Sequence, residues 1–180
     1  FKHFHEWKRL AEDQPGAVDM ETLLKGVCCK HNFIDLVENF IVFEDSPEGA
    51  KKIIANNHQY LGVNRAIETF LDRKHRNGKL GVFWHTQGSG KSYSMLFFTR
   101  KVHRKLGGNF TFLILTDRDD LDTQIYKTFA GCGVVDQKDN EIRAASGDNL
   151  SKLLTKQKSY IFSLIQKFNQ RVPEDKPYSL

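Results

Sequence analysis

One run of the chain, Gln87-Gly88-Ser89-Gly90-Lys91-Ser92, combines small residues with a cation and a hydroxyl. Its glycines allow the backbone to turn so that the N–H groups point inward, an arrangement that binds phosphate oxygens. The Lys91 ammonium would then reach the β- and γ-phosphates of a nucleotide, and the Ser92 hydroxyl would ligate Mg²⁺. The strict motif has glycine where His85 stands, so this run matches its looser form. The predicted nucleotide contacts are Gly88, Ser89, Gly90, Lys91 and Ser92.

Elements of alternating type surround this run and would position it. The apolar segment Leu80–Trp84 has the length of a strand, and Lys91–Leu106 follows with helical spacing. A helix that begins there adds its partial positive charge to the phosphate site. Further elements, in the order strand, helix, helix and strand, are predicted at Phe110–Leu115, Asp119–Phe129, Leu150–Leu154 and Tyr160–Phe162. Such apolar strands alternating with helices predict a doubly wound α/β fold, a parallel sheet with helices on both faces.

The first 50 residues read as a small mixed α/β segment that flanks this fold. A short amphipathic helix is predicted with Asp19 as its N-cap, and a second helix with Asn32 as its N-cap. The second helix would bury Phe33, Leu36 and Val37. A short strand is predicted at Phe40–Phe43. Beyond this segment, a long helix is predicted at Gln59–Lys74. We therefore expect a flanking segment over residues 1–50 and a nucleotide-binding segment over residues 51–180.

The composition excludes disorder and a membrane span. The 180 residues are 39% hydrophobic and 12% aromatic, enough for a buried core. The longest apolar runs are far shorter than the roughly 20 residues that cross a bilayer. The three cysteines have neither disulfide nor metal-ligand spacing, and no secretory signal is visible, so we expect a cytoplasmic protein. The net charge of +5 is weak evidence for nucleic-acid binding, and a solvated basic surface is the alternative.

A second polar run, Thr116-Asp117-Arg118-Asp119-Asp120, follows the predicted strand Phe110–Leu115. Ligands of open α/β sheets bind at the carboxyl ends of the strands, where these groups are placed. The run is also typical of a helix start, because acidic residues cap helices and favour their first turn. The two interpretations are compatible.

Four blocks of the chain together resemble a known family. In order they are His58-Gln59-Tyr60, FWHTQGSGKS, ILTDRDDLDTQI and Ile165-Gln166-Lys167-Phe168. They are similar to the restriction subunit (R subunit) of type I restriction-modification enzymes, a superfamily 2 helicase-like DNA translocase in which a nuclease domain precedes two RecA-like motor domains. The resemblance covers the chain from about Asn39 to Phe168. It implies that residues 51–180 are the first part of a RecA-like, P-loop motor domain, and that residues 1–50 are a linker from the nuclease region.

The resemblance also implies roles for individual residues. Gln59 corresponds to a glutamine that reads the adenine of ATP, Lys91 is the catalytic lysine, and Ser92 holds Mg²⁺. Thr116, Asp117 and Arg118 belong to a motif beside the DNA track. Gln166 and Lys167 lie in a DNA-side loop after the next strand. A threonine pair of the family is replaced here by Ser163-Leu164, so no phosphate contact is assigned to position 164.

The resemblance implies a function for the intact protein. ATP hydrolysis would be coupled to translocation along double-stranded DNA and to its cleavage, in a complex with methyltransferase and specificity subunits. The chain stops before the family's Asp-Glu-Ala-His block, so this fragment is expected to be inactive alone. The alternatives are another superfamily 2 helicase or remodeller ATPase, a P-loop nucleotide kinase or GTP-binding protein, and a scaffold with a vestigial site. Neither lid arginines nor an Asn-Lys-x-Asp run supports a kinase or a GTP-binding protein.

Overall fold

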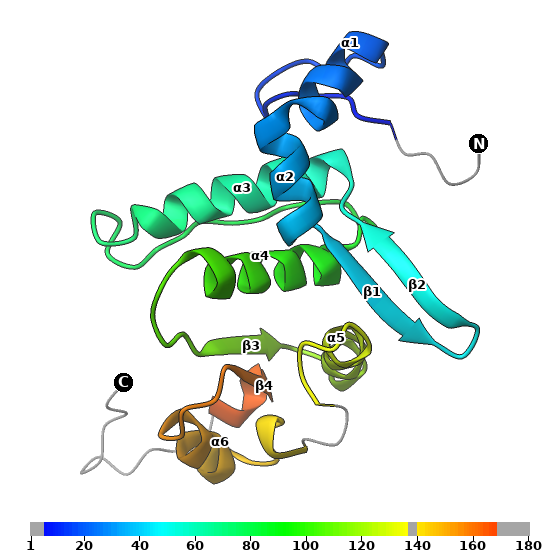
Figure 1. Ribbon diagram of the computed structural model, residues 1–180. Helices are drawn as coiled ribbons and strands as arrows, with labels where there is room; N and C mark the ends of the chain where they lie inside the picture. Colours follow the sequence, from blue (N-terminus) through cyan, green and yellow to red (C-terminus); the bar gives the residue numbers. More distant parts are fainter. Residues whose placement is uncertain (1–5, 137–139, 169–180) are drawn as a thin grey trace. The chain divides into compact units, whose positions relative to one another are not determined.

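The computed structural model describes residues 6–136 and 140–168, and the chain divides between Gly107 and Gly108 into two compact units. Figure 1 shows the helices and strands of each unit, which are described separately below. The boundary at residue 50, expected between the flanking and the nucleotide-binding segments, does not coincide with this division into compact units, and it stays a prediction. No helix within the described ranges combines the length and the apolar character that a membrane span requires.

The first unit opens with two short helices. Helix α1 (Met20–Leu23) runs into a π-helical turn, η1 (Leu24–Cys28), and helix α2 (Lys30–Asn39) follows. The predicted cap at Asp19 is confirmed, because its carboxylate accepts from the Thr22 N–H at 2.6 Å. The predicted cap at Asn32 is wrong. Asn32 lies inside α2 and its amide donates to the Gly26 carbonyl oxygen at 3.1 Å.

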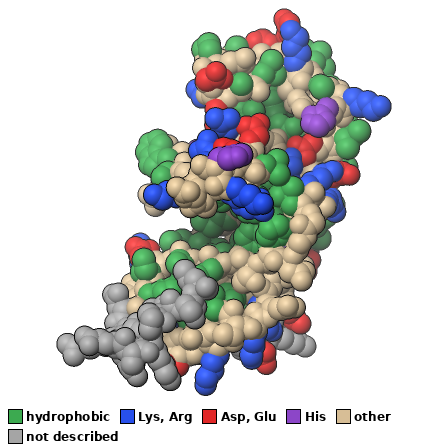
Figure 2. Space-filling model, turned by 90° about the vertical axis from the view of Figure 1, so that its left-hand side faces the viewer, with side chains coloured by type: hydrophobic (Ala, Val, Ile, Leu, Met, Phe, Trp, Pro, Cys, Tyr) green, Lys and Arg blue, Asp and Glu red, His purple; other side chains and the backbone are tan. Residues whose placement is uncertain are grey.

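Helix α2 buries less of its apolar surface than its sequence predicts. Leu36 is buried as expected, but Phe33 and Val37 are 54% and 51% exposed. The prediction for these two side chains is therefore wrong. A helical repeat identifies residues that share a face, whereas burial also requires a neighbouring element against that face. Figure 2 shows apolar side chains lying at the surface among charged ones.

A hairpin follows α2. Strand β1 (Ile41–Ser46) pairs antiparallel with β2 (Gly49–Ile54), and Val42 lies opposite Ile53. The sequence predicted the first strand at Phe40–Phe43 and missed β2. That strand is largely exposed and carries two adjacent lysines, so it lacks the apolar alternation that marks a half-buried strand.

Helices α3 (Asn57–Leu71) and α4 (Lys91–Lys105) pack against each other and form the centre of the first unit (Figure 1). The predicted helices at Gln59–Lys74 and Lys91–Leu106 are confirmed to within three residues. Phe40 packs between them, with its ring centroid 4.8 Å from that of Tyr60 and 5.6 Å from that of Phe97. The helix that follows the glycine-rich run is thus anchored in a buried aromatic cluster.

The strand predicted at Leu80–Trp84 is wrong. This segment pairs with no other described segment, and Val82 and Trp84 are 92% and 80% exposed. A strand exists only where a neighbour satisfies its backbone N–H and C=O groups, and an apolar composition cannot supply that neighbour. The backbone reaches the glycine-rich run as a loop.

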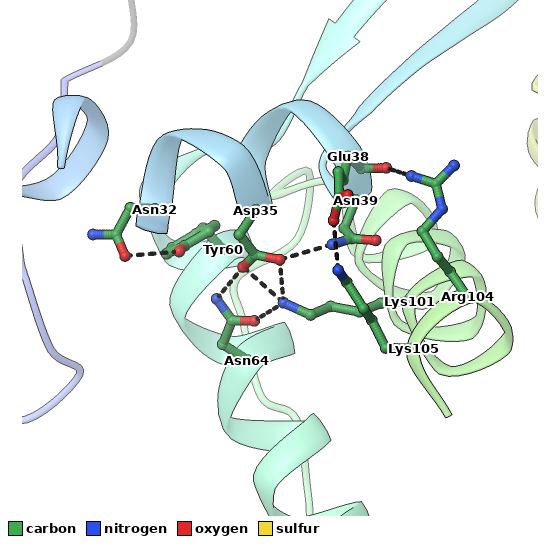
Figure 3. Close-up of polar contacts among 9 residues, drawn as sticks. All are labelled: Asn32, Asp35, Glu38, Asn39, Tyr60, Asn64, Lys101, Arg104 and Lys105. Atoms are coloured by element: carbon green, nitrogen blue, oxygen red, sulfur yellow. Dashed lines mark hydrogen bonds and ion pairs between the residues drawn. The ribbon is translucent and has the colours of Figure 1, made fainter. Parts of the chain in front are cut away.

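A buried polar cluster joins α2 to both α3 and α4, as Figure 3 shows. Lys101 of α4 donates from Nζ to the two carboxylate oxygens of Asp35 at 2.6 and 2.7 Å, and to Asn64 Oδ1 of α3 at 2.6 Å. Asn39 donates to the same carboxylate at 2.8 Å. Burial acts to raise the pKa of Asp35, but the hydrogen bonds from Lys101 and Asn39 outweigh it and hold that pKa below its ordinary value. The ion pair therefore fixes the three helices relative to one another.

The second unit contains a parallel strand pair. Strand β3 (Phe112–Thr116) pairs in parallel with β4 (Tyr160–Leu164), with Ile114 opposite Phe162. The helices are α5 (Asp119–Gly131) and α6 (Gly147–Leu154), with 3₁₀ turns η2 (Asn140–Ile142) and η3 (Ile165–Phe168). The strand and helix predictions for this unit are confirmed, with shifted bounds.

Successive side chains of β4 point to opposite faces of this strand pair. Tyr160 and Phe162 contact Phe129 of α5, with ring centroids 5.6 Å apart in each case. Ile161 instead joins the buried cluster of α6 with Leu150. Helices therefore cover both faces, as an α/β fold requires. The sheets of the described residues are small, however, since each contains two strands.

Candidate nucleotide-binding site

The glycine-rich run forms a tight loop at the start of α4. Gly88 and Gly90 have φ angles of 77° and 79°, in the left-handed region that favours glycine. Gly90 is also the N-cap of α4, and no side chain caps this helix. A Cβ on Gly90 would lie 2.7 Å from Nε2 of Gln59. The backbone conformation therefore favours glycine at position 90, and a Cβ there would also displace the Gln59 amide.

Lys91 points back over the loop. Its Nζ donates to the carbonyl oxygens of His85 and Thr86 at 2.9 and 2.8 Å. It forms no ion pair with any residue in the described part of the chain, so its positive charge is not neutralised by a carboxylate. An ammonium held only by carbonyl oxygens at a helix N-terminus suits an anionic ligand.

The Ser89 hydroxyl is a second feature of the loop that suits a phosphate ligand. Its hydroxyl oxygen is buried, yet within the described ranges it has no hydrogen-bond partner. A buried hydroxyl without a partner is uncommon, because the lost hydration is usually replaced by another hydrogen bond. A phosphate oxygen in the loop would accept from this hydroxyl. The residues of the loop thus fit the phosphates of a nucleotide.

The first turn of α3 is attached to this loop. Gln59 is buried and both ends of its amide are bonded: Oε1 accepts from the Asn56 N–H at 2.8 Å, and Nε2 donates to the Gly90 carbonyl oxygen at 2.9 Å. The first contact belongs to a capping box at the start of α3. The structure therefore brings Gln59 to the glycine-rich loop, where both ends of its amide bond to the backbone of the chain itself.

His58 also reaches the loop, and no role of its own was expected for it. Its Nε2 lies 3.0 Å from the carbonyl oxygen of Ser89. Its ring meets the ring of His85 edge-on at 4.8 Å, and His85 in turn meets Phe83 at 4.4 Å. Burial lowers the pKa of His85, and the nearby His58 and Lys91 lower it further. The only signal in the sequence was that His58 stands directly before Gln59.

A cavity of about 620 Å³ opens beside these histidines. It is bounded on one side by Lys8 and Arg9, whose backbone N–H groups donate to Asn57 Oδ1 at 3.2 and 3.0 Å. Asn57 donates in return to the Arg9 carbonyl oxygen at 2.9 Å. The N-terminal part of the described chain is thereby fastened to the start of α3. Sequence reasoning missed this contact, because it joins residues 48 positions apart.

A second group of predicted residues lies at the carboxyl ends of β3 and β4 in the second unit. Gln166 donates from Nε2 to the carbonyl oxygen of Asp117 at 2.6 Å, so these two predicted residues are brought together. Lys167 donates to the Ala144 carbonyl oxygen. Arg118 is exposed and pairs with Asp120. The guanidinium of Arg118 and the turn η3 therefore lie at the edge where ligands of α/β sheets bind.

Thr116 is buried and belongs to a cluster that sequence reasoning missed. Its hydroxyl lies 3.5 Å from the Asp122 carboxylate, at the limit of a hydrogen bond. Arg143 donates to Asp122 Oδ2 from Nη2 at 2.7 Å and from Nε at 3.2 Å. The Arg143 guanidinium also lies 5.2 Å from the Tyr126 ring centroid. Thr116 thus contributes to the support of this edge through Asp122, and no sequence motif marks Arg143 as the partner of Asp122.

Comparison with known proteins gives two kinds of match. Residues 58–179 match the family described as SWI2/SNF2 ATPase. The chain is 36% identical to the type I restriction enzyme HindI endonuclease subunit of Haemophilus influenzae, with 93% of this chain and 17% of that protein aligned. It is 32% identical to the putative type I restriction enzyme MjaIXP endonuclease subunit of Methanocaldococcus jannaschii, with 87% and 15% aligned. The chain therefore spans less than a fifth of the length of these relatives.

Proposed function

The chain belongs to the SWI2/SNF2 ATPase family, and on that premise we propose that it is the ATP-binding part of the motor of a type I restriction endonuclease R subunit. In the complete protein, ATP hydrolysis drives translocation along double-stranded DNA, and the same protein cleaves the DNA. The names of the two relatives, both endonuclease subunits of type I restriction enzymes, support this proposal. In it, residues 51–180 are the first part of a RecA-like motor domain, and residues 1–50 link that domain to the nuclease region.

The observation that carries the proposal is the loop at the start of α4. Three features of this loop suit the phosphates of ATP: its left-handed glycines, the Lys91 ammonium, and the buried Ser89 hydroxyl, which has no hydrogen-bond partner among the described residues. In the proposal, Lys91 offsets the charge that develops on the transferred phosphate. Ser92 at the first turn of α4 holds Mg²⁺, which, when bound, neutralises charge on the β- and γ-phosphates. Gln59 reads the adenine with the second N–H and the second lone pair of its amide, since each of its two backbone contacts uses only one of these.

The edge formed by β3 and β4 is the proposed DNA contact. Thr116 is the last residue of β3, and Asp117 and Arg118 follow it. Gln166 and Lys167 lie in η3 directly after β4, so all five come from the carboxyl ends of neighbouring parallel strands. Exposed Arg118 offers a guanidinium to a DNA phosphate. Methyltransferase and specificity subunits are the proposed protein partners, and the cytoplasm is the proposed compartment.

The test uses the complete protein with its partner subunits, because nuclease and motor must act together. We expect ATP hydrolysis that depends on unmodified double-stranded DNA, accompanied by DNA cleavage. DNA-dependent hydrolysis without cleavage would instead favour another translocase or remodeller of the SWI2/SNF2 family, the second candidate that the family match supports. Nucleotide hydrolysis that DNA leaves unchanged would contradict both.

A further inference from the structure

Two consecutive carbonyl groups of the phosphate loop are held by two consecutive side chains of α3. The Ser89 carbonyl oxygen lies 3.0 Å from Nε2 of His58, and the Gly90 carbonyl oxygen lies 2.9 Å from Nε2 of Gln59. A carbonyl oxygen only accepts hydrogen bonds, so Nε2 of His58 must carry the hydrogen in this contact. Both donors belong to the first turn of one helix. The loop is thus attached to α3 at two adjacent peptide groups.

The planarity of the peptide bond gives these contacts a second effect. In a trans peptide the C=O of one residue and the N–H of the next lie in one plane and point in opposite directions. No peptide bond in the described chain is cis. Holding the Ser89 carbonyl toward α3 therefore points the Gly90 N–H away from α3. Holding the Gly90 carbonyl does the same for the Lys91 N–H.

We propose that His58 is a positioning residue of the phosphate loop, which orients the Gly90 N–H toward the bound phosphate through the Ser89 carbonyl. This inference rests on the proposed function, because it concerns the same nucleotide site. His58 does not touch the nucleotide in this arrangement. It acts on the loop at the peptide that precedes Gly90, whose φ of 79° is in the left-handed region that favours glycine.

The ring of His58 also packs against His85, and this contact must be separated from the hydrogen bond. Three substitutions do so. H58F keeps an aromatic ring beside His85 and removes the donor. H58Q removes the ring and places an amide nitrogen near the position of Nε2. H58N carries the same amide, one methylene shorter, so that its nitrogen falls short of the Ser89 carbonyl.

The measurement is the Kd of the complete protein for a non-hydrolysable ATP analogue with Mg²⁺, by titration calorimetry well below the Tm of each variant. Loss of one hydrogen bond to a loop carbonyl corresponds to about three- to tenfold weaker binding. We expect this loss in H58F and H58N, and retention of most of the affinity in H58Q. If H58F does not fold, the comparison of H58Q with H58N decides alone.

Two results would overturn the inference and leave the proposed function intact. The first is parent-like affinity in both H58F and H58N, which would make the hydrogen bond irrelevant to binding. The second is equal loss in H58Q and H58N, which would show that a donor near the position of Nε2 restores no affinity. A parent protein that does not bind the analogue would overturn the proposed function together with this inference.

Discussion

Lys91 donates from Nζ to the carbonyl oxygen of Thr86 at 2.8 Å, so the ammonium of α4 lies folded against its own loop. A second donation, to the carbonyl of His85, holds it there. Carbonyl oxygens are weaker partners for an ammonium than phosphate oxygens, because they carry only a partial charge. A nucleotide phosphate can therefore take over these hydrogen bonds, and this exchange underlies the first prediction.

Replacing Lys91 by alanine should abolish DNA-dependent ATP hydrolysis in the complete protein. The ammonium is the one cationic side chain of the loop, and loss of such a group commonly costs about 3 kcal/mol or more of transition-state stabilisation, on the order of 100-fold in rate. Lys105→Ala, at the other end of the same helix, is the matched control, since Lys105 pairs with Glu38 on the surface. Equal hydrolysis rates in Lys91→Ala and the parent protein would mean that this loop is not the motor site.

Gln59→Ala should change the preference for ATP over GTP. A glutamine amide offers one donor and one acceptor, a pair that suits the adenine edge and that guanine does not match. The same substitution removes the capping box of α3, so a loss of about 1 kcal/mol in the free energy of unfolding is also expected. The measurement compares kcat/KM for the two nucleotides in both proteins. An unchanged ratio would restrict Gln59 to holding the Gly90 carbonyl.

Breaking the Asp35–Lys101 ion pair should strongly destabilise the protein. Asp35→Leu leaves the Lys101 ammonium buried without its carboxylate, and removal of one partner of a buried pair costs about 3–5 kcal/mol. The double variant Asp35→Leu with Lys101→Met should recover most of this loss, because it leaves no buried charge unpaired. Urea unfolding of the parent, the two single variants and the double variant measures the coupling. If the double variant instead loses the sum of the unfolding free energies that the two single variants lose, Asp35 and Lys101 are not coupled.

The same pair should make stability fall at acid pH. The pKa of Asp35 is lower in the folded protein than in the unfolded chain, where an aspartate has a pKa of about 3.9. Its contribution is therefore complete above that value and is lost as the pH falls through the folded-state pKa. We expect the urea midpoint of the parent protein to fall more steeply between about pH 5 and pH 2 than that of the Asp35→Leu, Lys101→Met variant. Parallel curves would show that another carboxylate governs acid unfolding.

Local sequence determined most of the helices and strands, and the glycine-rich loop. Apolar residues at helical spacing identified α3, α4 and α5, and continuous apolar runs identified β3 and β4, because these patterns reflect the geometry of a single helix or strand. The loop was evident for the same reason. Gly88 and Gly90 are needed for the turn itself, and Lys91 follows them at a fixed distance along the backbone.

Tertiary structure alone decided which groups these elements bring together. Val82 and Trp84 look like a strand but lie exposed, since a strand depends on a neighbour that its own sequence does not specify. Lys101 meets Asp35 across 66 positions, and His58 meets Ser89 across 31. Such partners depend on how whole helices pack, and every polar residue of similar reach is an equal candidate in the sequence. The chemistry of the loop could therefore be predicted from its residues. The side chains that hold the loop in place could not be predicted.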